Sequence, residues 1–222
     1  MRLFGKQKKP PFLYTEKALD QYEAFVAAHF GAYDSVFHEA ASQGIHLDII
    51  VVPPTDEHPY YKLVTMGMGA YAMQVPKNLK KYEMERAELV FFLPPDWPIA
   101  PTRPEDCWPL LTLRALARMP LKEGAWLGSG HSVPLPATET ATSFGGLLLL
   151  NAAGLEGELP ELRIPGFGKI NFYQLIPLYK EELQYKRQFG TQALLALWDA
   201  ADDFSPILDT ARKNYALSAK QF

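Results

Sequence analysis

Hydrophobic positions in the first part of the chain recur first at helical spacing and then in unbroken runs. Between residues 15 and 29 the apolar side chains fall on one face of a helix. Thr15 is a suitable N-cap, because its hydroxyl can accept from a free amide of the first turn. Gly31 can adopt the left-handed conformation that commonly ends a helix. Three runs rich in apolar residues follow, at 45–52, 61–66 and 87–93. Such runs predict strands with a packed layer on each face.

The second half of the chain predicts short elements of both kinds. Five prolines between residues 94 and 104 exclude a regular helix or strand there. A helix is expected from 105 to 118, with Pro109 in its opening turn. Short apolar runs between glycines and prolines then predict strands at 133–135, 144–150, 162–164 and 170–177. Helices are expected at 179–189, at 191–201 and from Ser205-Pro206 onward. The pattern favours an α+β fold, a mixed or antiparallel sheet flanked by helices.

Domain organisation and cellular setting follow from length, charge and cysteine content. We expect a flexible N-terminal leader over residues 1–14 and one domain over 15–222. The formal net charge of −3 predicts no general attraction to nucleic acid. No apolar stretch is long enough for a signal peptide or a membrane span. The single cysteine, Cys107, excludes an internal disulfide. A cytoplasmic protein that binds neither nucleic acid nor membrane is expected.

One glycine motif imitates a nucleotide-binding fingerprint. Gly67 and Gly69 follow a predicted strand, Ala72 occupies the third motif position, and Glu88 lies about 20 residues further on. The fingerprint requires a helix directly after the glycines, whose N-terminus holds the pyrophosphate. Here the chain reaches Pro76 too soon for such a helix. We therefore expect a tight turn or bulge and no cofactor.

A second group of residues suggests an enzyme as the alternative function. His46 and Asp48 are two apart on a predicted strand and would project from one face. Either His58 or His131 could complete a three-ligand metal site with them. An uncharacterised hydrolase or metal-dependent enzyme using His46, Asp48 and His131 is thus the alternative. A polar pair that closes a hydrogen bond is the simpler interpretation, so no catalytic or metal residue is assigned.

Two further patterns concern the surface. Glu181 and Glu182 lie among basic residues on a predicted helix, which is typical of a solvated helical face. Aromatic residues with polar tips occur in or beside the predicted loops and strand ends. Such side chains are favoured at recognition surfaces. The candidate partner-binding residues are His58, Tyr60, Tyr61, Trp97, Trp126 and His131.

Five sequence blocks, in order and spacing, carry a resemblance to a known family. They are the apolar run at 45–52, Tyr-Tyr-Lys-Leu-Val-Thr-Met-Gly-Met-Gly at 60–69, the apolar run at 87–94, Trp-Leu-Gly-Ser-Gly-His at 126–131, and 170–183. Together they resemble the suppressor-of-fused (SUFU) domain, particularly its stand-alone bacterial members. The resemblance implies a protein-binding module without catalysis, because the animal protein binds a peptide of a transcription factor as an added strand. Some bacterial relatives belong to toxin–immunity loci. An immunity protein that neutralises a toxin by direct binding is therefore the specific role that the resemblance suggests.

Overall fold

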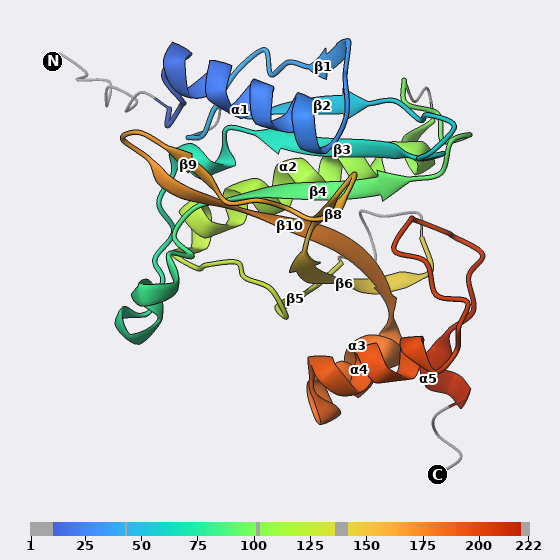
Figure 1. Cartoon of the computed structure of the whole chain (residues 1–222). Helices are drawn as coiled ribbons and strands as arrows, with labels where there is room; N and C mark the ends of the chain where they lie inside the picture. The colour runs from blue at the N-terminus through green and yellow to red at the C-terminus, as the bar shows by residue number, and fades with distance from the viewer. Residues whose placement is uncertain (1–10, 43, 101–102, 136–141, 219–222) are drawn as a thin grey trace, which may run out of the picture.

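The computed structural model describes residues 11–42, 44–100, 103–135 and 142–218. Its centre is an eight-stranded sheet with the order β1-β2-β3-β4-β10-β6-β5, in which β9 pairs with β10 (Figure 1). The strands of this sheet are β1 (Ser35–Phe37), β2 (Asp48–Val52), β3 (Tyr61–Met66), β4 (Ala87–Leu93), β5 (Ser132–Pro134), β6 (Phe144–Asn151), β9 (Leu162–Ile164) and β10 (Gly168–Tyr179). The helices are α1 (Glu16–His29), α2 (Trp108–Glu123), α3 (Lys180–Phe189), α4 (Thr191–Asp199) and α5 (Tyr215–Ser218). A separate small hairpin joins β7 (Ala153–Gly154) to β8 (Gly157–Glu158).

Neighbouring strands of the main sheet are antiparallel except at its centre. There β4 and β10 run parallel, with Asn171 opposite Ala87 and Gln174 opposite Val90. The sheet is therefore mixed, as the pattern of helices and strands predicts. Two short strands, β1 and β5, form its outer edges.

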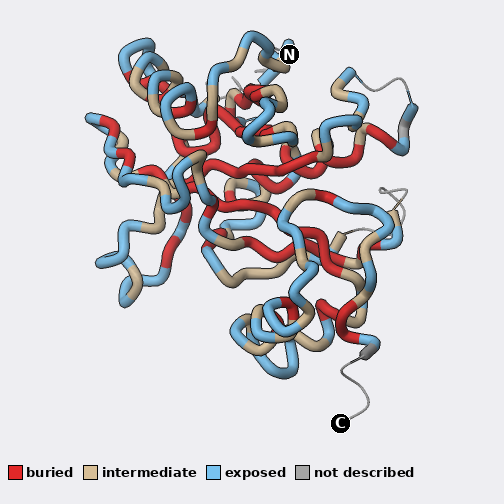
Figure 2. Tube along the Cα trace, turned by 45° about the vertical axis from the view of Figure 1, so that its right-hand side comes forward, coloured by how far each residue is buried: buried red, intermediate tan, exposed pale blue. Residues whose placement is uncertain are grey.

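Both faces of the central strand are covered, as its unbroken apolar run predicts. All seven residues of β4 are buried. Leu89, Phe91 and Leu93 face the core under α2, which contributes Trp108. Val90 and Phe92 face the opposite core under α1. The buried segments in Figure 2 accordingly follow the strands, and exposed ones lie on the outer surfaces.

A third cluster attaches the C-terminal helices to the far half of the sheet. Leu183 of α3 and Trp198 of α4 pack against Leu148 and Leu178 of β6 and β10. Figure 1 shows these helices gathered at one end of the molecule, away from α1. Among the described residues, no helix is both long and apolar enough to span a membrane.

Helix α1 forms where the sequence predicts it. It begins after Thr15, whose hydroxyl accepts from the Ala18 amide over 3.3 Å, and Gly31 follows its end with a φ of +120°. Of the expected leader, residues 1–10 lie outside the described part. Phe12 already bridges to Ile45, and Tyr14 is buried, so contacts with the domain begin before the helix.

Two helix predictions are wrong: the helix expected at 105–118 is shifted, and the one expected from Ser205-Pro206 does not form. Helix α2 begins at Trp108, after a separate 3-10 turn, and continues past 118 to Glu123 with Pro120 inside it. It ends where Gly124 turns left-handed. Pro120 is buried, so side-chain packing outweighs the main-chain hydrogen bond that a proline removes. Ser205-Pro206 opens no helix, because tertiary contacts use the polar groups of this segment instead. The final helix, α5, begins at Tyr215.

Candidate functional site

The 67–69 turn wraps around one buried carboxylate, that of Glu88 on β4. The main-chain amides of Gly67 and Gly69 each donate to Oε1 over 2.9 Å, and that of Met68 donates to Oε2 over 3.3 Å. The Tyr14 hydroxyl donates to Oε1 over 2.9 Å, and the Thr65 hydroxyl donates to Oε2 over 2.6 Å. Glu88 is fully buried, so five protein donors replace water around it.

Both glycines of the turn are required by close approach. A Cβ at Gly67, where φ is +123°, would lie 2.0 Å from the His46 carbonyl oxygen. A Cβ at Gly69 would lie 2.1 Å from the Tyr14 hydroxyl. Gly67 precedes a single short 3-10 turn, Met68–Ala70, and in the described chain no longer helix follows it directly. The amides that a nucleotide phosphate would need are already bound to Glu88, so the motif is an internal carboxylate-binding turn.

Burial controls the protonation of this cluster. It raises the pKa of Glu88 from 4.5 to about 7, although hydrogen bonds from Thr65, the turn amides and Tyr14 act in the opposite direction. It also raises the pKa of Tyr14 and of Tyr22 well above 10.0, so both phenols stay protonated near neutral pH. The cluster has no solvent access, and its chemistry is structural.

Asp48, a residue of the enzyme alternative, is buried at the start of β2 and lies close to two histidines that are themselves more exposed. Its carboxylate is 3.0 Å from His38 Nδ1 and 3.6 Å from His46 Nε2, and it accepts from the Glu39 amide over 2.8 Å. Ser42 Oγ lies 2.7 Å from His46 Nδ1. The Ser42–His46–Asp48 order imitates a catalytic triad, but 3.6 Å is too long for the second hydrogen bond.

The third residue of the enzyme alternative lies elsewhere. His131 precedes β5, while Asp48 begins β2, and four strands of the sheet separate β2 from β5. His58 lies before the first residue of β3, whereas Asp48 pairs with Met66, the last residue of β3, so the two lie at opposite ends of that strand. The structure therefore brings neither histidine to Asp48. Among the described residues, no group of three His, Cys, Asp or Glu side chains is placed to hold a metal ion.

The six candidate partner-binding residues are all partly exposed, and they form two groups. His58, Tyr60, Tyr61 and Trp97 lie where β3 begins and β4 ends, since Tyr61 pairs with Leu93. Tyr60 and Tyr61 point to opposite faces of the sheet, because each packs against a different core cluster.

The second group, Trp126 and His131, lies beside β5. Their rings meet edge to face with centroids 4.3 Å apart. Burial lowers the pKa of His131, although a hydrogen bond with the main chain of Trp126 acts to raise it. The neutral form of the imidazole is therefore favoured. Strands β10 and β6 lie between the two groups, so they are separate surfaces.

A groove adjoins β5, although neither Trp126 nor His131 lines it. It measures about 650 Å³ and lies between α2 and β5. Apolar side chains dominate its lining, among them Leu111, Leu116, Met119, Val133 and Leu135. Among the described residues, β6 is the one strand that pairs with β5. The sequence does not reveal this groove, because it depends on how α2 and β5 are placed against each other, which local patterns do not report.

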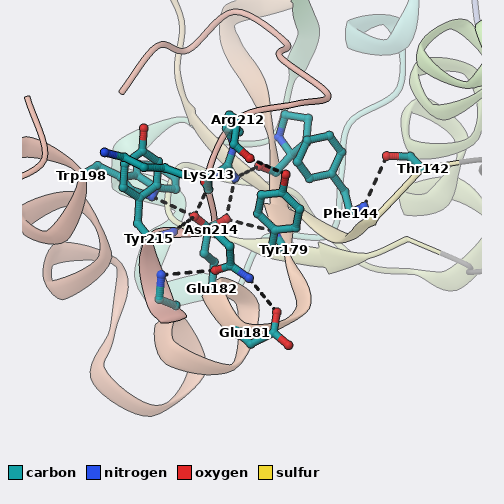
Figure 3. A network of polar contacts seen from close by, with 12 residues as sticks. Thr142, Phe144, Tyr179, Glu181, Glu182, Trp198, Arg212, Lys213, Asn214 and Tyr215 are labelled. Atoms are coloured by element: carbon teal, nitrogen blue, oxygen red, sulfur yellow. Dashed lines mark hydrogen bonds and ion pairs between the residues drawn. The ribbon is translucent and has the colours of Figure 1, made fainter. Parts of the chain in front are cut away.

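Glu182 is not solvated, so the expected Glu181–Glu182 surface is wrong at its second residue. Glu182 is fully buried and forms an ion pair with Arg212. Its carboxylate also accepts hydrogen bonds from the main-chain amide of Tyr179 over 2.9 Å and from the indole nitrogen of Trp198 over 3.4 Å (Figure 3). The buried carboxylate therefore ties the start of α3 to the segment before α5. The carboxylate of Glu181 accepts a hydrogen bond from the side-chain amide of Asn214 over 2.8 Å.

Known proteins share this fold. Of the curated relatives, an uncharacterised protein from Ureaplasma parvum is 27% identical over 195 residues, which cover 86% of this chain and 92% of that protein. A SUFU homologue from Neisseria gonorrhoeae has a TM-score of 0.59 at 18% identity, with 91% of this chain and 96% of that chain covered.

Two solved structures of suppressor-of-fused proteins extend the similarity. The Sufu–Fu complex has a TM-score of 0.60 at 16% identity and covers 96% of both chains. Drosophila Suppressor of Fused has a TM-score of 0.53 at 16% identity, and the match covers 82% of this chain but 47% of that protein. The model of the Suppressor of fused protein (SUFU) family matches residues 43–213, and the chain belongs to this family.

Proposed function

We propose that this chain is a non-catalytic protein-binding domain that adds an extended partner segment to the outer edge of β5. The observation that carries the proposal is the edge strand itself, with an apolar groove of about 650 Å³ beside it. Strand addition combines main-chain hydrogen bonds with pockets for alternate side chains. An edge strand and an adjoining apolar groove supply both requirements.

The register of β5 determines which groups face outward. The Leu149 amide donates to the His131 carbonyl, and the Leu135 amide donates to the Gly145 carbonyl. Inward and outward hydrogen bonding alternate along an antiparallel strand, so the main-chain groups of Ser132 and Pro134 face away from β6. Proline has no amide to donate. A partner strand would thus pair with Ser132 and accept no bond from Pro134.

Trp126 and His131 are the side chains that we assign to the rim of this surface. His58, Tyr60, Tyr61 and Trp97 form a second surface, where a larger partner would make additional contacts. The Sufu–Fu complex is a structure of a relative with another protein, which supports a binding role. Neutralisation of a toxin in the cytoplasm, as an immunity protein, is the specific role that we propose.

Affinity measurements with an identified partner test the site. The partner is isolated from the native host and identified, and its Kd is measured with purified wild type and variants. Val133→Asp places a charge in the groove, and Trp126→Ala removes the aromatic rim. Each should weaken binding about tenfold or more, which is about 1.4 kcal/mol. Lys17→Ala on the exposed side of α1 should leave the Kd unchanged.

The outcome of these measurements decides between surfaces. Wild-type affinity in folded Val133→Asp and Trp126→Ala would refute the β5 site. If Trp97→Ala alone weakens binding, the second surface is the binding site. The immunity role predicts that a toxin gene lies beside this gene. Co-expression of the wild-type chain should then restore growth of cells that produce that toxin, and Val133→Asp should not restore it.

A further inference from the structure

The main sheet contains a fork at its centre. Strands β4 and β10 pair from residues 87 and 171 to residues 90 and 174, and then they separate. In the described part of the chain, the last residues of β4 pair with β3 and those of β10 with β6. Each arm of the fork therefore has one strand edge that no neighbouring strand uses.

Residues 205–212, here called the strap, fill this fork without forming a strand. The Leu208 amide donates to the Phe92 carbonyl of β4 over 2.9 Å. On the other arm, the Gln174 side chain donates to the Pro206 carbonyl over 2.9 Å. The Leu208 side chain is 2% exposed and belongs to the core cluster under α2. Figure 1 shows this segment in red, rising from α4 toward the end of β4.

Arg212 anchors the other end of the strap. Its guanidinium pairs with the buried Glu182 carboxylate and donates to the Pro177 carbonyl over 2.8 Å. Its own carbonyl accepts from the Tyr179 hydroxyl over 2.5 Å. The guanidinium also lies over the rings of Phe144, Tyr179 and Tyr215 (Figure 3).

These contacts are those of a bound peptide. One leucine enters an apolar pocket, one arginine reaches a buried carboxylate, and main-chain groups bond to a strand edge. Most other strap residues are exposed. The strap also forms one wall of a hollow of about 360 Å³ that contains Trp97, so a displaced strap changes the surface around that residue.

We propose that the fork is a peptide-binding slot that the chain's own strap occupies. Its ligand class is an extended segment of a partner protein with a leucine followed four residues later by an arginine. Such a segment enters when the strap is released. This proposal concerns another surface than the edge of β5 and does not depend on it.

A labelled peptide and strap-releasing variants of the full chain test the slot. The probe is a fluorescent synthetic peptide with the sequence of residues 203–214. Arg212→Met should expose the slot, and the milder pair Gln174→Ala with Tyr179→Phe should expose it partly. Hydrogen exchange of the Leu208 amide, measured by mass spectrometry of peptides that contain it, should rise in both. Peptide affinity should rise at least tenfold over wild type in Arg212→Met, because the occupied fraction of the slot falls.

Two controls make the result specific. A probe peptide with methionine in place of its arginine should bind the released variants at least tenfold more weakly. Arg187→Met, which changes an exposed arginine on α3, should behave as wild type. Faster Leu208 exchange without peptide binding would overturn the proposal, as would equal binding to wild type. If Arg212→Met does not fold and the milder pair leaves exchange unchanged, the strap is a fixed part of the fold and the proposal fails.

Discussion

Replacement of Tyr14 by phenylalanine tests whether the buried Glu88 carboxylate holds the N-terminal segment. The change removes one hydroxyl, which donates to Glu88 Oε1 over 2.9 Å, and leaves the ring in place. A hydrogen bond to a charged group contributes about 1.5–3 kcal/mol, whereas a neutral one contributes about 1 kcal/mol. The loss should therefore be larger when Glu88 is ionised.

The direction of the pH effect follows from the pKa of Glu88. Because burial raises that pKa from 4.5 to about 7, ionisation disfavours the folded state, and this group's contribution to stability falls as pH rises between those values. The Tyr14 hydroxyl opposes the effect by stabilising the ionised form. Without it the pKa should rise further. Tyr14→Phe should thus cost about 1 kcal/mol at pH 5.5 and about 2 kcal/mol at pH 8.5.

Tyr22→Phe is the matched control. Tyr22 is also buried and stacks on Tyr14, but its hydroxyl donates to the Thr65 carbonyl, which does not titrate. Its cost should be similar at both pH values. Free energies of unfolding from urea titrations at pH 5.5 and 8.5 measure both variants. A Tyr14→Phe cost that is equal at the two pH values, or that decreases with pH, would refute the role of the hydroxyl.

Three further outcomes are expected. Phe91→Ala and Phe92→Ala should each lower the free energy of unfolding by about 3–5 kcal/mol, because the two rings fill cores on opposite faces of β4; losses below about 1 kcal/mol in urea titrations would contradict this packing. Lys62 is 1% exposed, and burial lowers its pKa. Lys62→Met should therefore raise the free energy of unfolding by about 1 kcal/mol, whereas Lys77→Met, at an exposed position, should leave it unchanged. Dialysis against a chelator should leave the Tm unchanged, and a drop that one divalent ion reverses would reveal a metal site near Asp48.

Local pattern was sufficient for most elements of the fold. The run at 87–93 is apolar at nearly every position, and it forms a strand with a core on each face. Thr15 caps the start of α1 with its hydroxyl, and Gly31 follows the end of α1 with a positive φ. These features depend on neighbouring residues along the chain, so the sequence alone carries them.

Contacts between distant segments were outside the reach of those patterns. Glu88 and Glu182 have ionisable side chains, which are rarely buried unless they are paired, yet each is fully buried. Their donors come from segments such as Tyr14 and Arg212, 74 and 30 residues away. Ser205-Pro206 has the local signals of a helix start, but the strap bonds to β4 and β10 instead.

The candidate site divides in the same way. The sequence by itself determined the family, the α+β class and the aromatic residues with polar tips. The tertiary structure decided that these aromatics form two surfaces, that β5 is an edge strand beside a groove, and that His131 lies away from Asp48. The physical reason is that strand order and burial depend on free energy summed over the whole chain, whereas propensity and periodicity report on residues close in sequence.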